Sequence, residues 1–377
     1  MQPHGPFNLS IDGTGGEARA SRVGLIDDRT GIPVSLLFLR GISNSQQFEF
    51  FSANDVETQI HECTDPDDQA AWKMLLPFFE AEGSRLHVVA HPLSKRKTRV
   101  LEEMVGTDRG LLRRTGLQVL KSYREKADTA FVPQASTLLS GAEHRLFHQK
   151  AFEFLSQDPH FFFIVDFPTT FSTEDVKGWV KKAVCADAAA YYPHLVRRNE
   201  IVSAGPVVAA AFQRNDDLLG IHYLPANQVI RGEFAPVLSQ TPAQMEELLS
   251  HRVNSFQRFA GHDLRVWGGY TLADRMDLDA RFISTRRTMI AIRETIHRIC
   301  EPFVLEPLST GLEKIIDVAL QSAFQPLRKL FDPEVKNPFE TEVSISSKKG
   351  QDVIHIDVKC RIPYVLGEMK LSLGVAA

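Results

Sequence analysis

The feature that most constrains this chain is a series of short, unbroken apolar runs, each preceded by an amphipathic stretch. Residues 161–167 (FFFIVDF) follow a helical pattern that starts near residue 144, and residues 86–90 follow another that stops at Gly83. A strand that faces water on one side alternates apolar and polar residues, so an unbroken apolar strand must be covered on both faces. The sequence therefore predicts a largely parallel α/β sheet with helices on both sides.

The last third of the chain follows a different pattern. A strand is expected at residues 265–272, and two amphipathic helices begin near Ser284 and Thr310. Apolar residues then alternate with polar ones from Val343 and again over residues 354–362, which is the period of half-buried strands. The predicted fold class is α/β plus α+β, with an N-terminal arm at 1–20, an α/β domain at 21–254, and a C-terminal α+β domain at 255–377 that includes a terminal arm at 363–377.

Both ends of the chain carry the alternation of a strand beside a break. An isolated strand of this kind either closes the sheet of its own chain or adds to an exposed sheet edge of a neighbouring molecule. We expect the two ends to act as intersubunit arms. Their apolar positions are Phe7, Leu9, Ile11, Met369, Leu371, Leu373 and Val375.

Composition excludes several classes of function. The chain has 377 residues, 43% of them hydrophobic, and a formal net charge of -4, which gives no general attraction to nucleic acid. No run approaches the ~20 apolar residues that a membrane span needs, and the N-terminus lacks the pattern of a secretory signal. The four cysteines stand far apart without metal-site spacing. We expect synthesis in the cytoplasm, no cofactor, no nucleic-acid partner and no membrane insertion.

Five segments occur in a specific order between residues 188 and 300. YYPHL, AGPVVAAAF and HYLPANQVIRG are followed by RVWGGYTL and the double-arginine stretch ARFISTRRTMIAIRETI. With Pro225, Ala226, Asn227 and Gly232 in the third segment, this order resembles the tail sheath proteins of contractile phages and of phage-tail-like injection machines. Gly269 and Tyr270 depart from the family pattern, in which Ala and Arg are common at these places, and leave the subtype open.

The resemblance implies a structural protein. Sheath subunits polymerise as stacked rings around an inner tube, exchange terminal strands with their neighbours, and contract to drive the tube through a target envelope. It also implies a subtilisin-like part at about 100–250 and an inner C-terminal domain. The implied partners are further copies of the chain, the inner tube protein, and the baseplate and terminator proteins. The resemblance further implies that the chain assembles in the bacterial cytoplasm and ends up in a virion tail or injection particle.

Basic residues in the C-terminal region are the candidate contact residues. The helix from residue 310 to 325 is the candidate tube contact, with Lys314, Arg328 and Lys329 offered to an acidic tube surface. The first helix carries Arg286, Arg287 and Arg293, which are candidate intersubunit charges. Solvated charge and contact with an acidic partner surface are the alternatives for these three residues, and exposed ion pairs contribute little as a rule.

A hydrolase is the alternative from another functional class. The sequence has no G-x-S-x-G elbow, and we expect no catalytic residue and no metal site. Asp166, at the end of the 161–167 run, stands where a catalytic acid can lie in an α/β sheet, but a structural role is the simpler prediction. His144 and His148 share a helix face and have the spacing of two metal ligands, but no third ligand accompanies them, so a solvated or capped helix face is expected.

Overall fold

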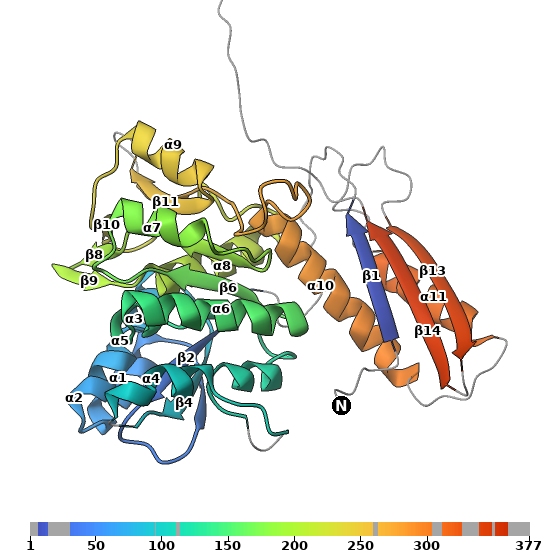
Figure 1. The fold of residues 1–377 in the computed structure, drawn as a ribbon, viewed down its shortest axis with the longest axis horizontal. Helices are drawn as coiled ribbons and strands as arrows, with labels where there is room; N and C mark the ends of the chain where they lie inside the picture. Colours follow the sequence, from blue (N-terminus) through green and yellow to red (C-terminus); the bar gives the residue numbers. More distant parts are fainter. Residues whose placement is uncertain are drawn as a thin grey trace, which may run out of the picture. The chain divides into compact units, whose positions relative to one another are not determined.

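A computed structural model describes residues 7–13, 31–94, 96–110, 114–258, 263–303, 311–325, 339–348 and 351–360 of the protein (Figure 1). The chain divides into two compact units. The larger unit contains residues 24–298, and the smaller one contains residues 1–23 together with 299–377. The chain passes from the larger to the smaller unit inside helix α10 (Ile283–Cys300).

The larger unit is built on an eight-stranded sheet. The strands lie in the order β12 (Leu264–Trp267), β11 (Val253–Arg258), β7 (Ala188–Tyr191), β6 (Phe162–Asp166), β5 (Thr129–Phe131), β2 (Pro33–Leu39), β4 (Leu86–Pro92) and β3 (Gln46–Phe50). The six inner strands are parallel, and the two edge strands pair antiparallel with their neighbours. The parallel sheet expected from the apolar runs is confirmed within this mixed sheet.

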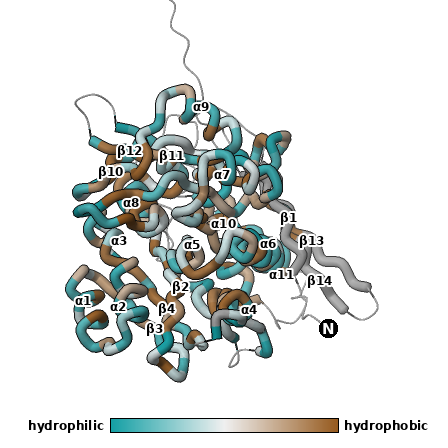
Figure 2. The backbone as a smooth tube through the Cα atoms, turned by 60° about the vertical axis from the view of Figure 1, so that its left-hand side comes forward, coloured by the Kyte–Doolittle hydropathy of each residue, from teal (hydrophilic) through white to brown (hydrophobic). Residues whose placement is uncertain are grey.

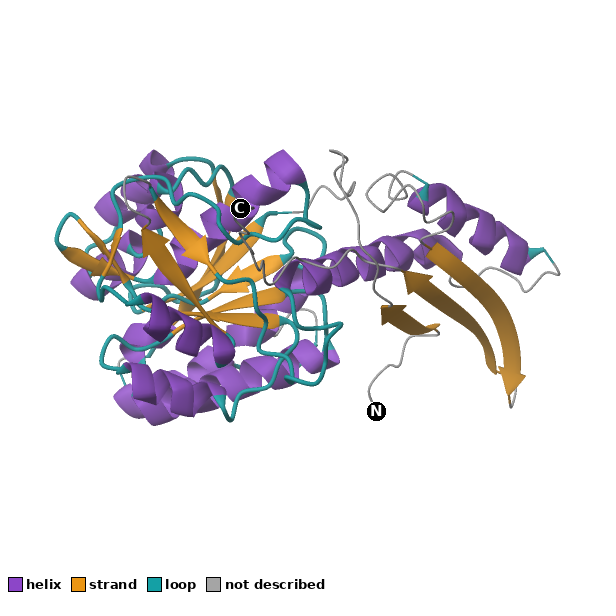
Figure 3. Ribbon diagram, turned by 90° about the horizontal axis from the view of Figure 1, so that it is seen from above, coloured by secondary structure: helices purple, strands orange, loops and turns teal. Residues whose placement is uncertain are grey.

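Helices cover both faces of this sheet (Figure 3). They are α1 (Ala53–Glu62), α2 (Pro66–Lys73), α3 (Leu76–Glu80), α4 (Val100–Val105), α5 (Ala135–Leu138), α6 (Gly141–Gln157), α7 (Thr173–Val180), α8 (Ala204–Leu219), α9 (Pro242–Ser250) and α10, with 3-10 turns at Lys97–Arg99 and Gly116–Ser122. Along β6, Phe163 and Val165 join the core that contains Trp179, while Phe162 and Ile164 join the core that contains Trp72. Burial on both faces explains why this strand has no polar alternation. In Figure 2, the hydropathy-coloured tube has brown, hydrophobic segments at β2 and β4.

A second, small sheet lies beside the main one in the larger unit. It contains β10 (Ala235–Pro236), β8 (Leu195–Arg197) and β9 (Glu200–Val202) in that order, so β9 is an edge strand. The turn between β8 and β9 holds Arg198 and Asn199, whose φ angles of 47° and 67° are those of a tight two-residue hairpin.

The smaller unit contains a three-stranded sheet and helix α11 (Leu312–Phe324), preceded by a 3-10 turn at Glu301–Phe303. The strand order is β1 (Phe7–Gly13), β14 (Gln351–Cys360) and β13 (Phe339–Lys348). β13 and β14 form a hairpin, and β1 lies parallel to β14, with Phe7 opposite Ile354 and Gly13 opposite Cys360. The strand alternation predicted near residues 7–11 and 354–362 therefore corresponds to real strands, and here β1 pairs with its own chain.

The division of the chain into two compact units does not fall at the boundary expected between residues 254 and 255. β11 crosses it, and both β11 and β12 belong to the eight-stranded sheet. The division falls after Arg298 because most of α10 packs with the larger unit. The terminal arm expected at 363–377, with Met369, Leu371, Leu373 and Val375, lies outside the described residues.

Candidate functional site at the two edges of the sheet

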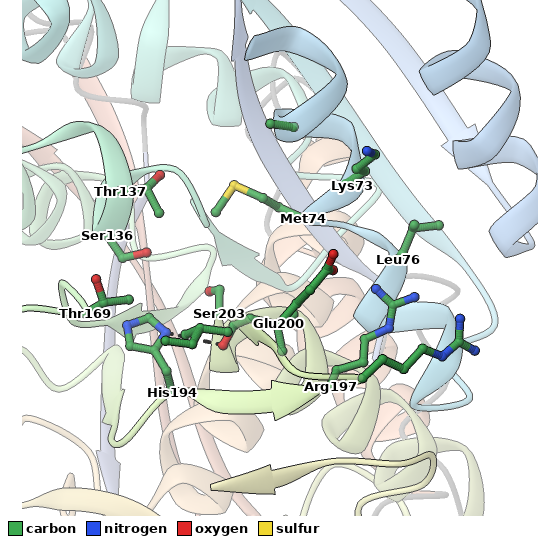
Figure 4. Close-up of a pocket in the computed structure, with 14 residues that line it drawn as sticks. Lys73, Met74, Leu76, Ser136, Thr137, Thr169, His194, Arg197, Glu200 and Ser203 are labelled. Carbon is green, nitrogen blue, oxygen red and sulfur yellow. Dashed lines mark hydrogen bonds between the residues drawn. The ribbon is translucent and has the colours of Figure 1, made fainter. Parts of the chain in front are cut away.

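A pocket of about 500 Å³ lies beyond the carboxyl ends of β5, β6 and β7 (Figure 4). We call it the carboxyl-edge pocket. Such edges are where open α/β sheets usually bind their ligands, so its side chains bear on the hydrolase alternative. It is lined by Ala70, Lys73, Met74, Leu76, Ser136, Thr137, Thr169, His194, Arg197, Arg198, Glu200, Ile201, Val202 and Ser203.

Asp166 ends β6 and is held by the start of helix α8. The Ser203 hydroxyl donates to Asp166 Oδ2, and the Gly205 backbone N–H donates to the same oxygen at 3.0 Å. A Cβ on Gly205 would stand 2.6 Å from Oδ2, so only glycine allows this approach. Burial raises the pKa of Asp166, while His194 and these hydrogen bonds act in the opposite direction. The side chain thus anchors the N-terminus of α8 to β6.

His194 does not complete a catalytic relay with these groups. Its Nε2 contacts the backbone carbonyl of Phe167, and its Nδ1 lies 3.3 Å from the carbonyl oxygen of Val202. A serine nucleophile needs to donate to the base that deprotonates it, whereas Ser203 donates to Asp166. The arrangement therefore fixes a helix terminus and a loop, and it lacks the proton path of a serine hydrolase.

The strand order reverses between β2 and β5, and the crevice at such a reversal is the usual ligand site of α/β sheets. Here the buried Gln134 side chain bridges the two strands. Its Oε1 accepts from the Phe38 N–H at 2.6 Å, and its Nε2 donates to the Phe38 carbonyl at 2.9 Å. The backbone of β2 is thus already satisfied at the place where a ligand would bind.

The expectation that His144 and His148 lie on a solvated face is wrong. Both are buried, among rings that include Trp179. His144 donates to the Asp166 carbonyl at 2.8 Å and His148 to the His144 carbonyl at 2.9 Å. Burial lowers the pKa of His144 to about 4 and that of His148 well below its ordinary value. Within the described ranges, no group of three or more His, Cys, Asp or Glu side chains has an arrangement that could hold a metal ion.

The amino edge of the same sheet is ionic. Arg287 on α10 is 1% exposed and donates to Asp216 at 2.5 and 3.0 Å and to Asp128 at 2.8 Å. Its guanidinium also lies 4.8 Å from the centre of the Phe212 ring. Burial alone would lower the pKa of Arg287, but the two carboxylates raise it. Burial raises the pKa of Asp216 to about 6 in spite of Arg287.

The turn before β2 also contacts this ionic cluster. Gly31 has φ +79°, and its N–H donates to Asp128 Oδ2 at 3.1 Å. A Cβ at Gly31 would stand 3.1 Å from the Asp216 Cβ. The cluster of Arg287, Asp128 and Asp216 therefore joins α10 to α8 and to the amino ends of β2 and β5.

Two more arginines of α10 contact the same edge. Arg286 donates to Asp187, the residue before β7, at 2.7 and 3.0 Å. Arg293 donates to the Pro159 carbonyl at 2.9 Å. The intersubunit role predicted for Arg286, Arg287 and Arg293 stays a prediction, and the contacts found for all three lie within one chain.

Glu294 and Asp158 hold His160 just before β6. The ring contacts Glu294 through Nδ1 and Asp158 through Nε2 at 2.7 Å, and Arg124 lies 3.5 Å from Glu294. Burial alone would lower the pKa of His160, but its hydrogen bonds with Asp158 and Glu294 outweigh burial and raise it. The ring nitrogens both face carboxylates, which favours the protonated form.

The predicted tube-contact residues are only partly within the described chain. Lys314 lies exposed on α11, whereas Arg328 and Lys329 lie outside the described residues. Ile315 and Val318, 53% and 66% exposed, share the outer side of α11 with Lys314. The sequence pattern emphasised the charge and missed these two aliphatic side chains. Among the described helices, none is long and apolar enough to cross a membrane.

The comparisons with known proteins depend on structure, since no protein-family model and no curated protein matches the sequence. A chain of the anti-feeding prophage baseplate in its contracted state is 18% identical over 96% of this chain and 97% of its own, with a TM-score of 0.72. A chain of an extracellular contractile injection system, the PVC sheath complex in its contracted state, is 16% identical over 97% and 98%, with a TM-score of 0.66.

A sheath tail protein is similar as well. The sheath tail protein of Desulfitobacterium hafniense is 11% identical over 92% of this chain and 99% of its own, with a TM-score of 0.56. Identities this low establish the fold. The chain thus has the α/β fold of contractile sheath proteins, over nearly its whole length, and its structural neighbours are structural proteins of phage-tail-like injection systems.

Proposed function

We propose that this chain is the sheath subunit of a contractile, phage-tail-like injection machine. The observation that carries the proposal is the fold match over nearly the whole length of both chains, which includes chains from contracted assemblies. Copies stack as rings around an inner tube and slide into a tighter packing that drives the tube through a target envelope. The partners are further copies, the inner tube, the baseplate and the terminator, and assembly takes place in the bacterial cytoplasm.

Strand exchange between neighbours is part of this proposal. β1 and β13 are the edges of the three-stranded sheet, and β1 pairs with β14 over seven residues. Each backbone hydrogen bond contributes about 1 kcal/mol net, and a neighbour's β1 would make the same bonds in the same register. Domain swapping of this kind costs little because the contacts are identical. The arm at 363–377 is proposed to act in the same way on an adjacent sheet.

A single cysteine tests whether β1 is exchanged. Gly13 is in register with the native Cys360, and neighbouring strands lie within the Cα separation that a disulfide spans. In oxidised Gly13→Cys particles, exchanged strands give a ladder of covalently linked copies on a non-reducing gel. Asn8→Cys, which lies opposite His355, is the matched control and should give no ladder. A band of monomer alone in assembled Gly13→Cys particles would contradict strand exchange.

Helix α11 is the proposed tube contact. Its buried side holds Leu312, Ile316, Leu320 and Phe324, which leaves the side with Lys314, Ile315 and Val318 for a partner. Lys314→Glu should weaken attachment of the tube without preventing sheath assembly. Co-purification of the tube at rising salt measures this, because a contact between exposed charges weakens as salt increases.

We infer that hydrolysis is not the function, and that the subtilisin-like description concerns the fold alone. The support is the hydrogen bond from Ser203 to Asp166, which bypasses His194. We expect no peptidase or esterase turnover that depends on Asp166. Activity of the purified chain that disappears in Asp166→Asn would instead favour a hydrolase, and negative-stain micrographs of the same sample show whether tubes form.

A further inference from the structure

A rigid acidic loop stands at the amino edge of the larger unit. Residues 274–279 (DRMDLD) are all exposed, between buried Ala273 and Ala280. We call this segment the acidic loop. It contains three aspartates and one arginine, and it presents Met276 at 87% and Leu278 at 59% exposure. Large exposed apolar side chains are typical of protein–protein interfaces, where methionine is enriched.

Hydrogen bonds fix the shape of the acidic loop. The Thr271 hydroxyl donates to the Ala280 carbonyl at 2.5 Å and closes its base. Within it, Asp274 Oδ1 accepts from the Met276 N–H and Asp277 Oδ1 accepts from the Ala280 N–H, both at 2.9 Å. A loop already held in one shape loses less conformational entropy when it binds, which favours its use as a contact element.

The carboxyl-edge pocket has the complementary chemistry. Its lining contains three basic residues and one acidic residue. Arg197 is paired with Glu80, while Arg198, whose side chain is 71% exposed, lies 3.9 Å from Glu80 and faces solvent together with Lys73. Met74 and Leu76 provide apolar lining, and Ile201, 56% exposed, extends it on edge strand β9. A volume of about 500 Å³ falls in the range of pockets that hold a small ligand.

The loop and the pocket lie at opposite edges of one sheet, so neither can serve the other within a copy. The Leu272 N–H donates to the Ala188 carbonyl, at the amino end of β7. His194, in the pocket lining, lies beyond the carboxyl end of the same strand. Figure 1 shows β8 and β9 at the left of the larger unit and the start of α10, which follows the acidic loop, at the right.

We infer that the acidic loop of one copy docks in the carboxyl-edge pocket of a second copy of this chain. Met276 and Leu278 fill the apolar part, and the loop carboxylates face Lys73 and Arg198. The contact joins two different surfaces of identical molecules, and such a contact propagates as a ring or helical row. It is independent of the terminal arms and does not require the proposed sheath function.

A photo-crosslinker at position 276 tests the contact in the full-length protein. Met276 is replaced by a benzophenone amino acid, and ¹⁴N- and ¹⁵N-labelled copies are mixed before assembly or self-association. We expect cross-links between isotopes to residues 70–76 and 197–203. The same probe at Leu218, also exposed at 65%, is the matched control and should not reach those residues. Cross-links confined to one copy, directed elsewhere, or absent altogether would overturn the inference.

A charge exchange tests the chemistry of the same contact. Asp277→Lys should lower the cross-linked yield about fivefold, which corresponds to the upper value for one exposed ion pair. Adding Arg198→Glu to Asp277→Lys should restore the yield. No change in either variant would favour another partner for both surfaces. Because tubes are scored separately by microscopy, loss of the cross-link and failure of the sheath proposal remain distinguishable.

Discussion

The two edges of the eight-stranded sheet hold their neighbouring helices by different chemistry. At the amino edge, α10 is held by a buried arginine between two carboxylates, Asp128 and Asp216. At the carboxyl edge, α8 is held by a carboxylate that accepts hydrogen bonds from its first residues. Removing one partner of a buried charge pair leaves an uncompensated charge, whereas removing the carboxylate at the α8 cap leaves only neutral donors without their acceptor.

The largest expected effect is at the amino edge. Arg287→Met leaves two carboxylates without their cation in a buried site, and breaking a buried pair in this way costs about 3–5 kcal/mol of unfolding free energy. Urea denaturation of the purified chain measures it. Adding Asp128→Asn and Asp216→Asn should recover most of the loss, while Arg198→Met at an exposed position should stay within about 0.5 kcal/mol. A loss below about 1 kcal/mol in Arg287→Met would remove the distinction between the edges.

The next effect is a pH dependence with opposite signs at the two edges. The pKa of His144 is about 4 in the folded chain and 6.5 ordinarily. The stability that neutral His144 allows is therefore fully present above pH 6.5 and is lost as pH falls to 4. The loss is on the order of 3 kcal/mol. The raised pKa of His160 has the reverse sign, since its contribution is present below pH 6.5 and is lost as pH rises through the folded pKa.

Two variants separate these contributions. His144→Asn should flatten the fall in stability of the folded chain between pH 6.5 and pH 4. His160→Asn should flatten the fall on the alkaline side of pH 6.5. Thermal unfolding across this pH range measures both, and parallel curves for the two variants would contradict opposite signs.

The smallest expected effect is at the cap of α8. Asp166→Ala leaves the buried Gly205 N–H without its acceptor, which costs about 1–3 kcal/mol. Asp175→Ala, at the exposed capping box of α7, is the matched control and should cost about 1 kcal/mol or less. An equal loss of unfolding free energy in Asp166→Ala and Arg287→Met would show that the cap and the ion cluster contribute equally to stability.

Much of the fold was predictable because burial leaves a pattern in the sequence. Phe162 to Val165 face two cores, which removes polar alternation and marks a central parallel strand. The antiparallel edge strand β12 was placed in another domain because the composition of a strand does not say which sheet it joins. Local composition does not reveal pairing between distant residues, such as the hydrogen bond between the Asn227 N–H and the Val266 carbonyl.

The ionic partners were less predictable than the arginines. The double-arginine stretch identified Arg286 and Arg287, but not that they contact acids of their own chain. Asp128 and Asp187 each stand one residue before a strand of the sheet, a signal that would have placed them at its amino edge. Asp216 had no such signal, since its orientation depends on how α8 rotates against the sheet.

The pairing of β1 with β14 has a consequence for synthesis. Phe7 is the register partner of Ile354, so the first strand leaves the ribosome long before its partner exists. At translation rates of about 5–20 residues per second, this delay is roughly 20–70 s. Pairing of β1 within its own chain therefore has to wait until β14 has been synthesised.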